Sequence, residues 1–576
     1  MYNGFDTECY INSGELKIIG VENLGVFYIP KKSTPIYFVF ELMKQNKMNK
    51  FCCYNLDYDI GALIKHIFPL YLYKKINLGL QVKYKQVSFR YLKGKKCVIT
   101  YKNYRIYFYD CFQFYKTNLK SSSKKFLNLN KGDFNIIKMY EGILEKHLLS
   151  ALKYCYQDSV LCGKLFRLII KKIENAGIKN PEPISQGYIA YQYFKNELLK
   201  IPHVPLNNEF MKAYKGGRFE VFKRGYFKKA YYYDICSAYP YAISKITSLE
   251  NCKTIINDLY LTEADYSVFK CDVSIPFNVI IGPIGIKINE KTYYPTGFLK
   301  DIWIDKNDYD CLTLCKATIN IKIAYHLITK KETLFKNKVL KIYKNKLKFP
   351  KDNEIWKILL NAIYGKLLQN IKHYIRKIES KFASSIADVF YDNNSGELFF
   401  KFDNEGRALN YVFASYITSH TRKQIYFDIF KYQKNIIAIF TDGIITDRKL
   451  PLKISTKLGC YKLKTITNLY MIGTGIYFYN CEGKKHSLFR GFHVKEANKI
   501  LKKIIKSKRS IVNFEINERI GLGKAIAQHN LIDFNLILPV IKRLNLNFDD
   551  KRIWNFKIKK GQDLRKISSS IPIPII

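Results

Sequence analysis

Acidic residues are scarce in this chain relative to basic ones. Its 576 residues contain 48 Asp and Glu against 96 Lys and Arg, which gives a formal net charge of +48. Such an excess of one sign repels itself unless a polyanion neutralises it. The apolar fraction of 48% is that of a folded protein, so a wholly disordered chain is excluded. A nucleic acid is therefore the first candidate partner, and an anionic membrane surface is the second.

The sequence also lacks an uninterrupted apolar run near the roughly 18 residues that a membrane-spanning helix needs. Its first eight residues have neither the charged and apolar stretches of a secretion signal nor the arginines of a transit peptide. The 14 cysteines form no C-x-x-C pair, which argues against a zinc or iron–sulfur module. We therefore expect an intracellular, soluble protein with reduced thiols and no membrane partner.

Short β-rich runs alternate with helical stretches, which predicts an α/β fold with several domains. Residues 26–29 and 36–40 are rich in β-branched and aromatic residues and are expected to be strands. Residues 144–173 and the lysine-rich stretch 331–368 are expected to be helical, the second with a break at its Phe-Pro pair. A polar turn between aromatic runs predicts a hairpin over 391–400.

Two acids near the N-terminus indicate a metal site. Asp6 and Glu8 stand two residues apart on an expected strand, so both side chains leave the same face. Neighbouring carboxylates repel each other unless a cation such as Mg2+ lies between them. For this pair alone, the alternative is an exposed polar strand face.

Two further fragments follow along the chain. Asn55-Leu-Asp-Tyr-Asp59 lies in an apolar setting, and Tyr154 and Asp158 stand four apart on one face of the expected helix. Each fragment alone could be accidental, but the order D-x-E, N-L-x-x-D, Y-x-x-x-D is much less so. Four acids around two metal ions suit phosphodiester hydrolysis, with Tyr154 orienting the attacking water.

A second acidic pair lies further along the chain. Asp234 ends an aromatic strand in the string D-x-x-S-x-Y-P, and Asp442 lies at the tip of an expected strand–turn–strand unit. Together they would hold two Mg2+ ions that activate a primer hydroxyl and clamp phosphates in line. The alternatives are an Asp N-cap before a proline turn at Asp234 and a plain Asp-Gly hairpin at Asp442.

One helix carries the sharpest motif in the chain. Lys357, Asn361 and Tyr364 fall at i, i+4 and i+7, so they share a face. That face offers a cation for a triphosphate, an amide, and a flat ring beside a base pair, and Gly365 permits close approach of a nucleotide. The alternative is an amphipathic helix with a solvated lysine.

Taken together, these motifs resemble those of the family B DNA polymerases, and most of all the protein-primed branch used by bacteriophages, other viruses and linear plasmids. Tyr214-Lys-Gly-Gly217 matches the Y-x-G-G motif of that branch. The resemblance implies a multidomain α/β fold in which an RNase H-like 3′–5′ exonuclease domain precedes a right-hand polymerase of palm, fingers and thumb. Two insertions typical of protein-primed enzymes are also implied.

The implied domain boundaries follow the motifs. They are an exonuclease domain over 1–175, a linker with Y-x-G-G and the first part of the palm over 176–246, an insertion contacting the priming protein over 247–325, fingers over 326–368, a hairpin insertion over 369–409, the second part of the palm over 410–481, and a basic thumb with C-terminal tail over 482–576. The last segment holds 21 basic and 8 acidic residues, and its tail, 571–576, is expected to be frayed.

The resemblance also implies roles for individual residues. The exonuclease metals would be bound by Asp6, Glu8, Asp59 and Asp158, and the polymerase metals by Asp234 and Asp442. The incoming nucleotide would be contacted by Tyr239 as the sugar gate, by Lys346 from the cluster Lys344, Lys346 and Lys348, and by Lys357, Asn361 and Tyr364. DNA would be contacted by Asn55, Tyr214, Gly216, Gly217, Arg218, Thr418, Arg422 and Tyr477.

The implied cofactor is Mg2+, with Mn2+ as a substitute, and the implied substrates are dNTPs. The implied partners are template and primer DNA, a terminal protein that provides the priming hydroxyl, and a single-stranded DNA-binding protein. The expected place of action is the host cytoplasm, or the mitochondrion for an enzyme encoded by an organellar plasmid.

Three positions depart from the family pattern. Phe440-Thr-Asp442 keeps one of the two acids that usually surround the Thr, and Gly475-Ile-Tyr477 lacks the lysine of a Lys-x-Tyr motif, for which Lys462 or Lys464 could substitute. Cys111 replaces a hydroxyl in a motif that binds single strands. Two alternatives therefore stay open: a nucleic-acid-primed family B polymerase, and a DNA-binding homologue with impaired catalysis.

Overall fold

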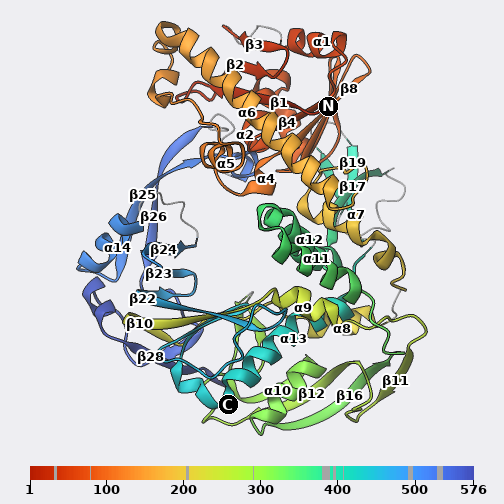
Figure 1. Ribbon diagram of the computed structural model, residues 1–576, viewed down its shortest axis with the longest axis vertical. Coiled ribbons are helices and arrows are strands. Elements are labelled where there is room, and N and C mark those ends of the chain that lie inside the picture. The colour runs from red at the N-terminus through yellow and green to blue at the C-terminus, as the bar shows by residue number, and fades with distance from the viewer. Residues whose placement is uncertain are drawn as a thin grey trace.

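The computed structural model describes residues 1–30, 36–77, 79–202, 206–289, 291–378, 389–392, 397–405, 408–490, 497–527 and 536–575. Within these ranges, no helix is long and apolar enough to cross a bilayer. The cysteines are free thiols, and most of them are buried, as expected. Figure 1 shows an N-terminal sheet at the top, a central sheet below it, and segments on both sides that connect the two.

The N-terminal sheet has the strand order β3-β2-β1-β4-β8-β7-β6-β5. The pairs β1–β4 and β4–β8 are parallel, and the remaining neighbours are antiparallel. The strands are β1 (Asn3–Cys9), β2 (Leu16–Val21), β3 (Gly25–Tyr28), β4 (Lys50–Cys53), β5 (Val82–Tyr84), β6 (Val87–Leu92), β7 (Lys96–Tyr101) and β8 (Tyr104–Asp110). Its helices include α1 (Tyr37–Gln45), α2 (Leu56–Ile67), α3 (Tyr73–Asn77), α5 (Leu119–Leu127) and α6 (Leu148–Asn175).

One expected strand in this part is wrong, and one expected helix is confirmed. Residues 37–45 form helix α1 instead of a strand over 36–40. Buried Ile36, Val39, Phe40 and Met43 recur at helical spacing, so tertiary burial overrides the local β-preference. The expected helix over 144–173 corresponds to α6 with a short 3-10 turn before it.

The central sheet has the path β24-β23-β22-β10-β21-β20-β9 and is covered by α13 (Tyr411–Ile429) and α9 (Ala238–Ser244). Its long middle strand, β10 (Lys223–Ile235), pairs antiparallel with β21 and β22. The other strands are β9 (Phe219–Val221), β20 (Ile436–Phe440), β21 (Gly443–Thr446), β22 (Tyr461–Gly473), β23 (Ile476–Cys481) and β24 (Lys484–Phe489).

Residues 247–325, called the insertion below, form most of a third sheet with the order β11-β16-β12-β15-β29. Helix α10 (Lys306–Leu314) lies against this sheet and against α13. The strands are β11 (Lys253–Asn257), β12 (Tyr266–Ile275), β15 (Thr296–Asp305), β16 (Thr318–Ile328), which extends past the insertion, and β29 (Pro574–Ile575).

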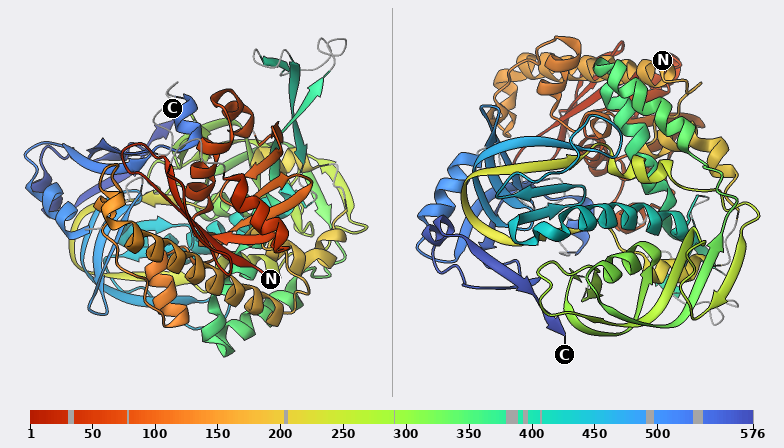
Figure 2. Two further views of the ribbon diagram at one scale, coloured as in Figure 1. Left: turned by 90° about the horizontal axis from the view of Figure 1, so that it is seen from above. Right: turned by 60° about the horizontal axis from the view of Figure 1, so that its bottom comes forward.

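Two helices lie between the N-terminal and central sheets: α11 (Lys336–Lys348) and α12 (Asn353–Leu367). They confirm the expected helical stretch with a break at Phe349-Pro350. Helix α12 packs on α7 (Gln186–Leu199), while α8 (Asn207–Ala213) packs on α13. The hairpin segment, β17 (Asn370–Ile378), β18 (Val389–Asp392) and β19 (Glu397–Glu405), stands away from the rest (Figure 2). The expected pairing across 391–400 is confirmed, and its turn lies outside the described residues.

The C-terminal segment connects the central sheet to the N-terminal sheet. The ribbon of β25 (Ile511–Arg519) and β26 (Ile537–Asn545) packs on α14 (Ala497–Lys506) at its base. Near its other end, Ile520 and Ala525, in and beside α15 (Leu522–Ala527), are buried in the core of the N-terminal sheet. Arg519 there donates a 3.0 Å hydrogen bond to the carbonyl of Asp57.

The expected frayed tail is wrong. Residues 568–575 form β28 (Ser568–Pro572), which pairs with β10 and β27 (Arg552–Trp554), and β29, which pairs parallel with β15 of the insertion. Backbone hydrogen bonds to two existing sheets hold the Ile-Pro tail in place, and its local sequence gave no sign of these partners.

Candidate active sites

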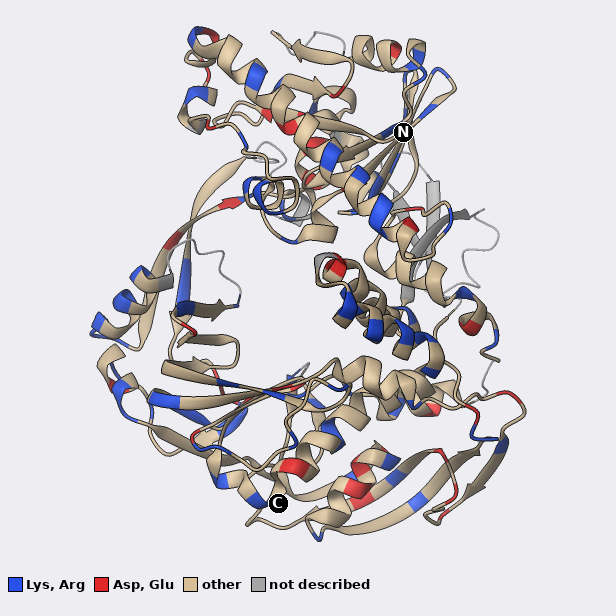
Figure 3. Ribbon diagram, in the orientation of Figure 1, with Lys and Arg blue, Asp and Glu red and all other residues tan. Residues whose placement is uncertain are grey.

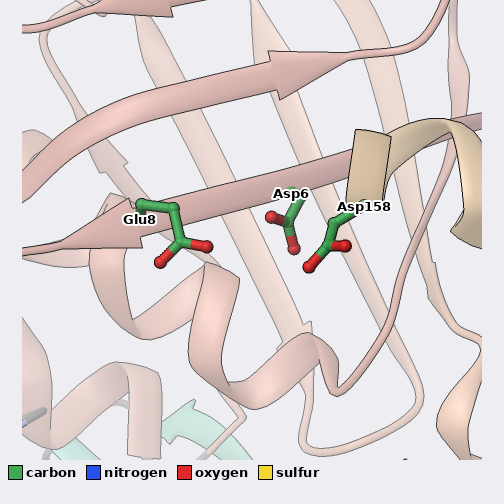
Figure 4. A group of neighbouring side chains, drawn as sticks. All are labelled: Asp6, Glu8 and Asp158. Atoms are coloured by element: carbon green, nitrogen blue, oxygen red, sulfur yellow. The ribbon is translucent and has the colours of Figure 1, made fainter. Parts of the chain in front are cut away.

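An acidic cluster lies where β1 meets α6. Asp6 and Glu8 leave the same face of β1, as expected, and Asp158 of α6 points toward both (Figure 4). One carboxylate oxygen from each of the three lies within 4.8 Å of the others. This arrangement brings together the D-x-E and Y-x-x-x-D motifs, which are about 150 residues apart in sequence.

Glycines allow α6 to come this close to β1. A Cβ atom on Gly4 would lie 1.6 Å from the carbonyl oxygen of Ser159, the residue after Asp158. A Cβ atom on Gly163 would lie 1.8 Å from the Glu22 carboxylate, which accepts a 2.9 Å hydrogen bond from the Gly4 amide. The helix is therefore in direct backbone contact with the strand, and this contact sets the spacing of the acids.

Asp59, the fourth predicted acid, lies beside this cluster on α2. It is buried, its Oδ1 accepts a 2.8 Å hydrogen bond from the Thr7 hydroxyl, and its charge raises the pKa of Asp6. Asn55 precedes α2 in a left-handed conformation with its side chain exposed. The buried Asp110, which our sequence reasoning gave no role, fixes this turn by accepting hydrogen bonds from the Asn55 and Phe112 amides at 3.2 and 3.0 Å.

Burial and mutual repulsion make these carboxyls hold protons tightly. Burial, with the charge of Asp158, raises the pKa of Glu8 to about 8, and burial raises that of Asp59 to about 7. Burial and the charges of Asp158 and Asp59 likewise raise the pKa of Asp6. Among the described residues, one oxygen each of Asp6, Asp59 and Asp158 is buried with no hydrogen-bond partner. Unpaired, crowded carboxylate oxygens are the donor set that a hard divalent cation needs, so the residues fit Mg2+.

A lysine that our sequence reasoning missed completes the cluster. Lys131 forms an ion pair with Asp158, and its ammonium lies 4.7 Å from the ring centre of Tyr154. Burial opposes its charge, but the carboxylate of Asp158 raises its pKa, so the cation persists. It lies in a polar loop without a helical or strand pattern, which is why periodicity gave no signal for it. Lys131 can neutralise charge that builds up at this site.

The second acidic pair lies at one end of the central sheet. Asp234 is opposite Gly443 in the antiparallel register of β10 and β21, and the Ile235 amide donates a 3.0 Å hydrogen bond to the Asp442 carbonyl. Burial and the charge of Asp234 raise the pKa of Asp442 to about 6, and burial raises that of Asp234. The sheet therefore holds the two predicted acids side by side, and their oxygen donors fit a divalent cation.

Lysines surround this pair. Lys462 is directly opposite Asp234 on β22, and its charge, with those of Lys464 and Lys346, opposes the rise in the pKa of Asp234. Lys346 of α11 donates a 2.9 Å hydrogen bond to the Ser237 hydroxyl, and burial and the charges of Lys462 and Lys357 lower its pKa. Lys346, the residue chosen from the lysine cluster, and Lys462, one of the two candidates to replace the missing Lys-x-Tyr lysine, thus both lie near Asp234, and their roles stay predictions.

The tyrosines predicted to contact the nucleotide or the DNA also lie close to this acidic pair. The hydroxyls of Tyr214 and Tyr364 are 2.6 Å apart, and the rings of Tyr364 and Tyr239 are 4.7 Å apart. Lys357 and Asn361 are exposed on α12, the helix that carries Tyr364. The ring of Tyr477 stacks on Phe440, with centres 5.0 Å apart, next to the turn that carries Asp442. The nucleotide-binding roles of these residues remain predictions.

Gly217 of the Y-x-G-G loop is packed against the same turn. A Cβ atom there would lie 2.7 Å from Thr441 Cγ2 and 2.9 Å from the Tyr239 hydroxyl. A Cβ atom on Gly216 would meet nothing within 4 Å. Close packing therefore requires a glycine at position 217, whereas position 216 has room for a side chain.

Three residues expected to contact DNA have their polar groups inside the protein. Arg218 is buried, pairs with Glu220, and donates a 2.8 Å hydrogen bond to the Gly282 carbonyl. Thr418 and Arg422 are also buried and donate to the backbone of the Y-x-G-G loop. Direct phosphate contact by these side chains does not fit this arrangement, because they are buried and most of their hydrogen-bonding groups have protein partners. Thr418 and Arg422 hold the loop instead.

Positive charge is concentrated on the elements between the two acidic sites. Figure 3 shows lysines along α11 and α12, and the sequence of α11 alone, KNKVLKIYKNKLK, contains six. Helix α14 of the C-terminal segment adds four more. These helices carry part of the excess charge noted in the sequence.

The comparisons with known proteins agree with this geometry. The family model of type B DNA polymerases of organellar and viral origin matches residues 144–395. The chain is 25% identical over 463 residues to the DNA polymerase of Acidianus bottle-shaped virus, which covers 73% of this chain and 61% of the relative. It is 25% identical over 340 residues to the probable DNA polymerase of Ascobolus immersus, which covers 54% of this chain and 28% of the relative. The matched regions span less than two thirds of either relative.

Solved structures extend the likeness to nearly the whole chain. Phi29 DNA polymerase, complexed with primer-template DNA and incoming nucleotide, superposes with a TM-score of 0.67 at 14% identity, over 94% of this chain and 99% of that one. The phi29 complex with single-stranded DNA gives the same values. These comparisons show that the chain is similar to type B DNA polymerases of the organellar and viral type and shares the fold of phi29 DNA polymerase. The expected resemblance and the expected multidomain α/β fold are confirmed.

Proposed function

We propose that the protein is a DNA-directed DNA polymerase that edits its product. Nucleotide addition is assigned to the residues around Asp234 and Asp442, and 3′–5′ exonucleolytic removal to the cluster of Asp6, Glu8, Asp59 and Asp158. The proposed domains keep the boundaries given by the sequence, from an exonuclease over 1–175 to a thumb over 482–576. The observation that carries the proposal is the presence of two separate acidic sites on one chain, with basic helices between them.

Each site would use side chains already in place. At the polymerase site, Lys346 and Lys357 would bind the triphosphate, and the Tyr239 ring would exclude a ribose 2′-hydroxyl. At the exonuclease site, Tyr154 would orient the attacking water, and Asn55 would hold the 3′ strand. Mg2+, or Mn2+ in its place, would be bound by the acids of each site and would activate the nucleophile and neutralise phosphate charge.

The proposed macromolecular partners are template and primer DNA and a terminal protein. Phi29 DNA polymerase, named in the solved complexes, was crystallised with primer-template and single-stranded DNA, which supports the DNA partners. Protein priming is supported by the Y-x-G-G motif and by the two insertions. A single-stranded DNA-binding protein is a further proposed partner, and the host cytoplasm or a mitochondrion is the proposed place of action.

Separation of the two activities tests the proposal. With Mg2+ and dNTPs, wild-type protein should extend a 5′-labelled primer on a template and, without dNTPs, should shorten it. Asp442→Asn should abolish extension and retain shortening, and Asp6→Asn with Asp59→Asn should do the reverse. Asp550→Asn, at an exposed acid paired with Lys291, is the matched control and should retain both.

A second candidate is a DNA-binding homologue without polymerisation, which the single acid of the Asp442 turn favours. Failure of wild-type protein to extend any primed template, with DNA binding intact, would support it. Priming has its own assay: transfer of a labelled dNMP onto the protein encoded by the neighbouring open reading frame. Extension of DNA primers alone, without such transfer, would support a nucleic-acid-primed enzyme.

A further inference from the structure

A buried ionic contact joins the insertion to the Y-x-G-G loop. Asp308, in the first turn of α10, is 1% exposed. Its Oδ2 accepts a 2.8 Å hydrogen bond from the ammonium of Lys215, the second residue of that loop. Its Oδ1 accepts a 3.0 Å hydrogen bond from the guanidinium of Arg422 on α13. One carboxylate of the insertion thus fixes two cations, one of them within the loop.

Helix α13 holds the backbone of the same loop. Arg422 donates hydrogen bonds to the carbonyls of Lys215 and Gly216 at 2.7 and 2.9 Å. The Thr418 hydroxyl donates to the Lys215 carbonyl at 2.7 Å. Asp308 orients the Arg422 guanidinium. Because this group is planar and its N–H bonds point in fixed directions, a hydrogen bond from one of them to a carboxylate also fixes the directions of the other N–H donors.

The loop leads directly to the groups of the polymerase site. Gly217 is packed against Thr441 and the Tyr239 hydroxyl. The Thr441 amide donates a 2.7 Å hydrogen bond to the carbonyl of Arg218, which follows Gly217. Thr441 immediately precedes Asp442 and has a left-handed backbone with φ of 61°. The position of Asp442 therefore depends on a loop whose other side is held by Asp308 through Lys215 and Arg422.

We infer that Asp308 of the insertion is a positioning residue for nucleotide addition. It acts through Lys215 and Arg422 on the Y-x-G-G loop, and through the loop on Tyr239 and the Asp442 turn. This inference rests on the proposed function, because it concerns the polymerase site defined there. Removing one charge from a buried ion pair leaves the partner uncompensated, so the two cations would reorient toward water and release the loop.

The variant Asp308→Asn keeps the shape of the side chain and removes its charge. Its matched control is Asp301→Asn in the same insertion, since Asp301 is 44% exposed and pairs with Lys322 away from the loop. We expect Asp308→Asn to lower kcat for correct dNTP addition about tenfold or more, the value of a charge-assisted hydrogen bond. KM for dNTP should stay within about twofold, because no group proposed to bind the triphosphate is touched. Trimming of single-stranded DNA and the control variant should match wild type.

Hydrogen exchange gives a readout separate from activity. Asp308→Asn should speed exchange of the Thr441 amide, which donates its hydrogen bond to the Arg218 carbonyl of the loop, about tenfold, and should leave the amides of β12 and β15 unchanged. Equal kcat values for Asp308→Asn, Asp301→Asn and wild type would overturn the inference. So would a parallel loss of both activities with faster exchange throughout the insertion, because that pattern indicates a general structural role.

A second variant decides the outcome if Asp308→Asn does not fold. Thr418→Val removes one loop contact without leaving a buried charge unpaired. A selective loss of kcat in Thr418→Val would support positioning through the loop, and a wild-type kcat would overturn it. The proposed function fails separately, by absence of primer extension in wild-type protein.

Discussion

Gly4→Ala should impair the proposed exonuclease site selectively, without changing any acidic residue. The new Cβ atom would lie 1.6 Å from the Ser159 carbonyl oxygen, whereas ordinary van der Waals contact begins near 3.4 Å. Helix α6 would have to retreat from β1 by about 1.8 Å, the difference between those distances. Asp158 precedes Ser159 on that helix, so it would move away from Asp6 and Glu8.

The expected loss follows from that displacement. A misplacement of about 1 Å in a reacting geometry can cost on the order of 100-fold in rate, so trimming should fall at least that far. Overpacking costs about 1–3 kcal/mol, which lowers the melting temperature but leaves the chain folded. Primer extension should stay within about twofold of wild type, because the proposed polymerase site is built on a different sheet.

The assay follows a 5′-labelled single strand with Mg2+ on a denaturing gel, beside primer extension by the same preparation. Gly521→Ala is the matched control, because a Cβ atom there meets nothing within 4 Å. Trimming by Gly4→Ala at the wild-type rate would show that the helix–strand contact does not set the geometry of the acids. Loss of both activities would show that the contact serves the whole fold instead.

Three other predictions follow from the same geometry. In metal-free protein, burial raises the pKa of Glu8 to about 8, so its contribution to stability is full below pH 4.5 and is lost as pH rises toward 8. The melting temperature in EDTA should therefore fall over that range, and it should fall less in Glu8→Gln. Mg2+ should restore the melting temperature most at pH 8, and a pH-independent effect of Mg2+ would show that repulsion among the carboxylates is not the cause. Gly217→Ala should lower nucleotide addition about tenfold or more by displacing Thr441 and Tyr239, with Gly216→Ala near wild type; equal rates in primer extension would rule out the packing role. Tyr239→Val should relax discrimination against rNTPs, and unchanged rejection in a competition assay would remove Tyr239 from the sugar gate.

Local sequence patterns predicted the positions of several acidic residues in the two sites. The two-residue repeat of β1 placed Asp6 and Glu8 on one face, and helical spacing placed Asp158 on the matching face of α6. The order of these motifs then predicted that they meet, which the structure confirms. The alternation of a strand, a turn and a strand likewise predicted the place of Asp442.

Contacts between distant segments could not be predicted in the same way. Lys131 belongs to a loop and acts only because α6 brings Asp158 beside it. Arg422 has the charge of a phosphate ligand, yet its partner is a buried Asp308 more than a hundred residues earlier. The tail beyond residue 567 is ordered by strands of the central sheet and the insertion, and no local feature of an Ile-Pro repeat indicates such partners.

The central claim is that one chain gathers metal ions at two separate acidic sites. Anomalous diffraction from crystals of the wild-type protein with Mn2+, primer-template DNA and a non-hydrolysable dNTP tests it directly. We expect one set of peaks between the carboxylates of Asp234 and Asp442 and a second among those of Asp6, Glu8 and Asp158. A fully occupied DNA complex with no peak beside Asp234 and Asp442 would contradict the proposed polymerase site.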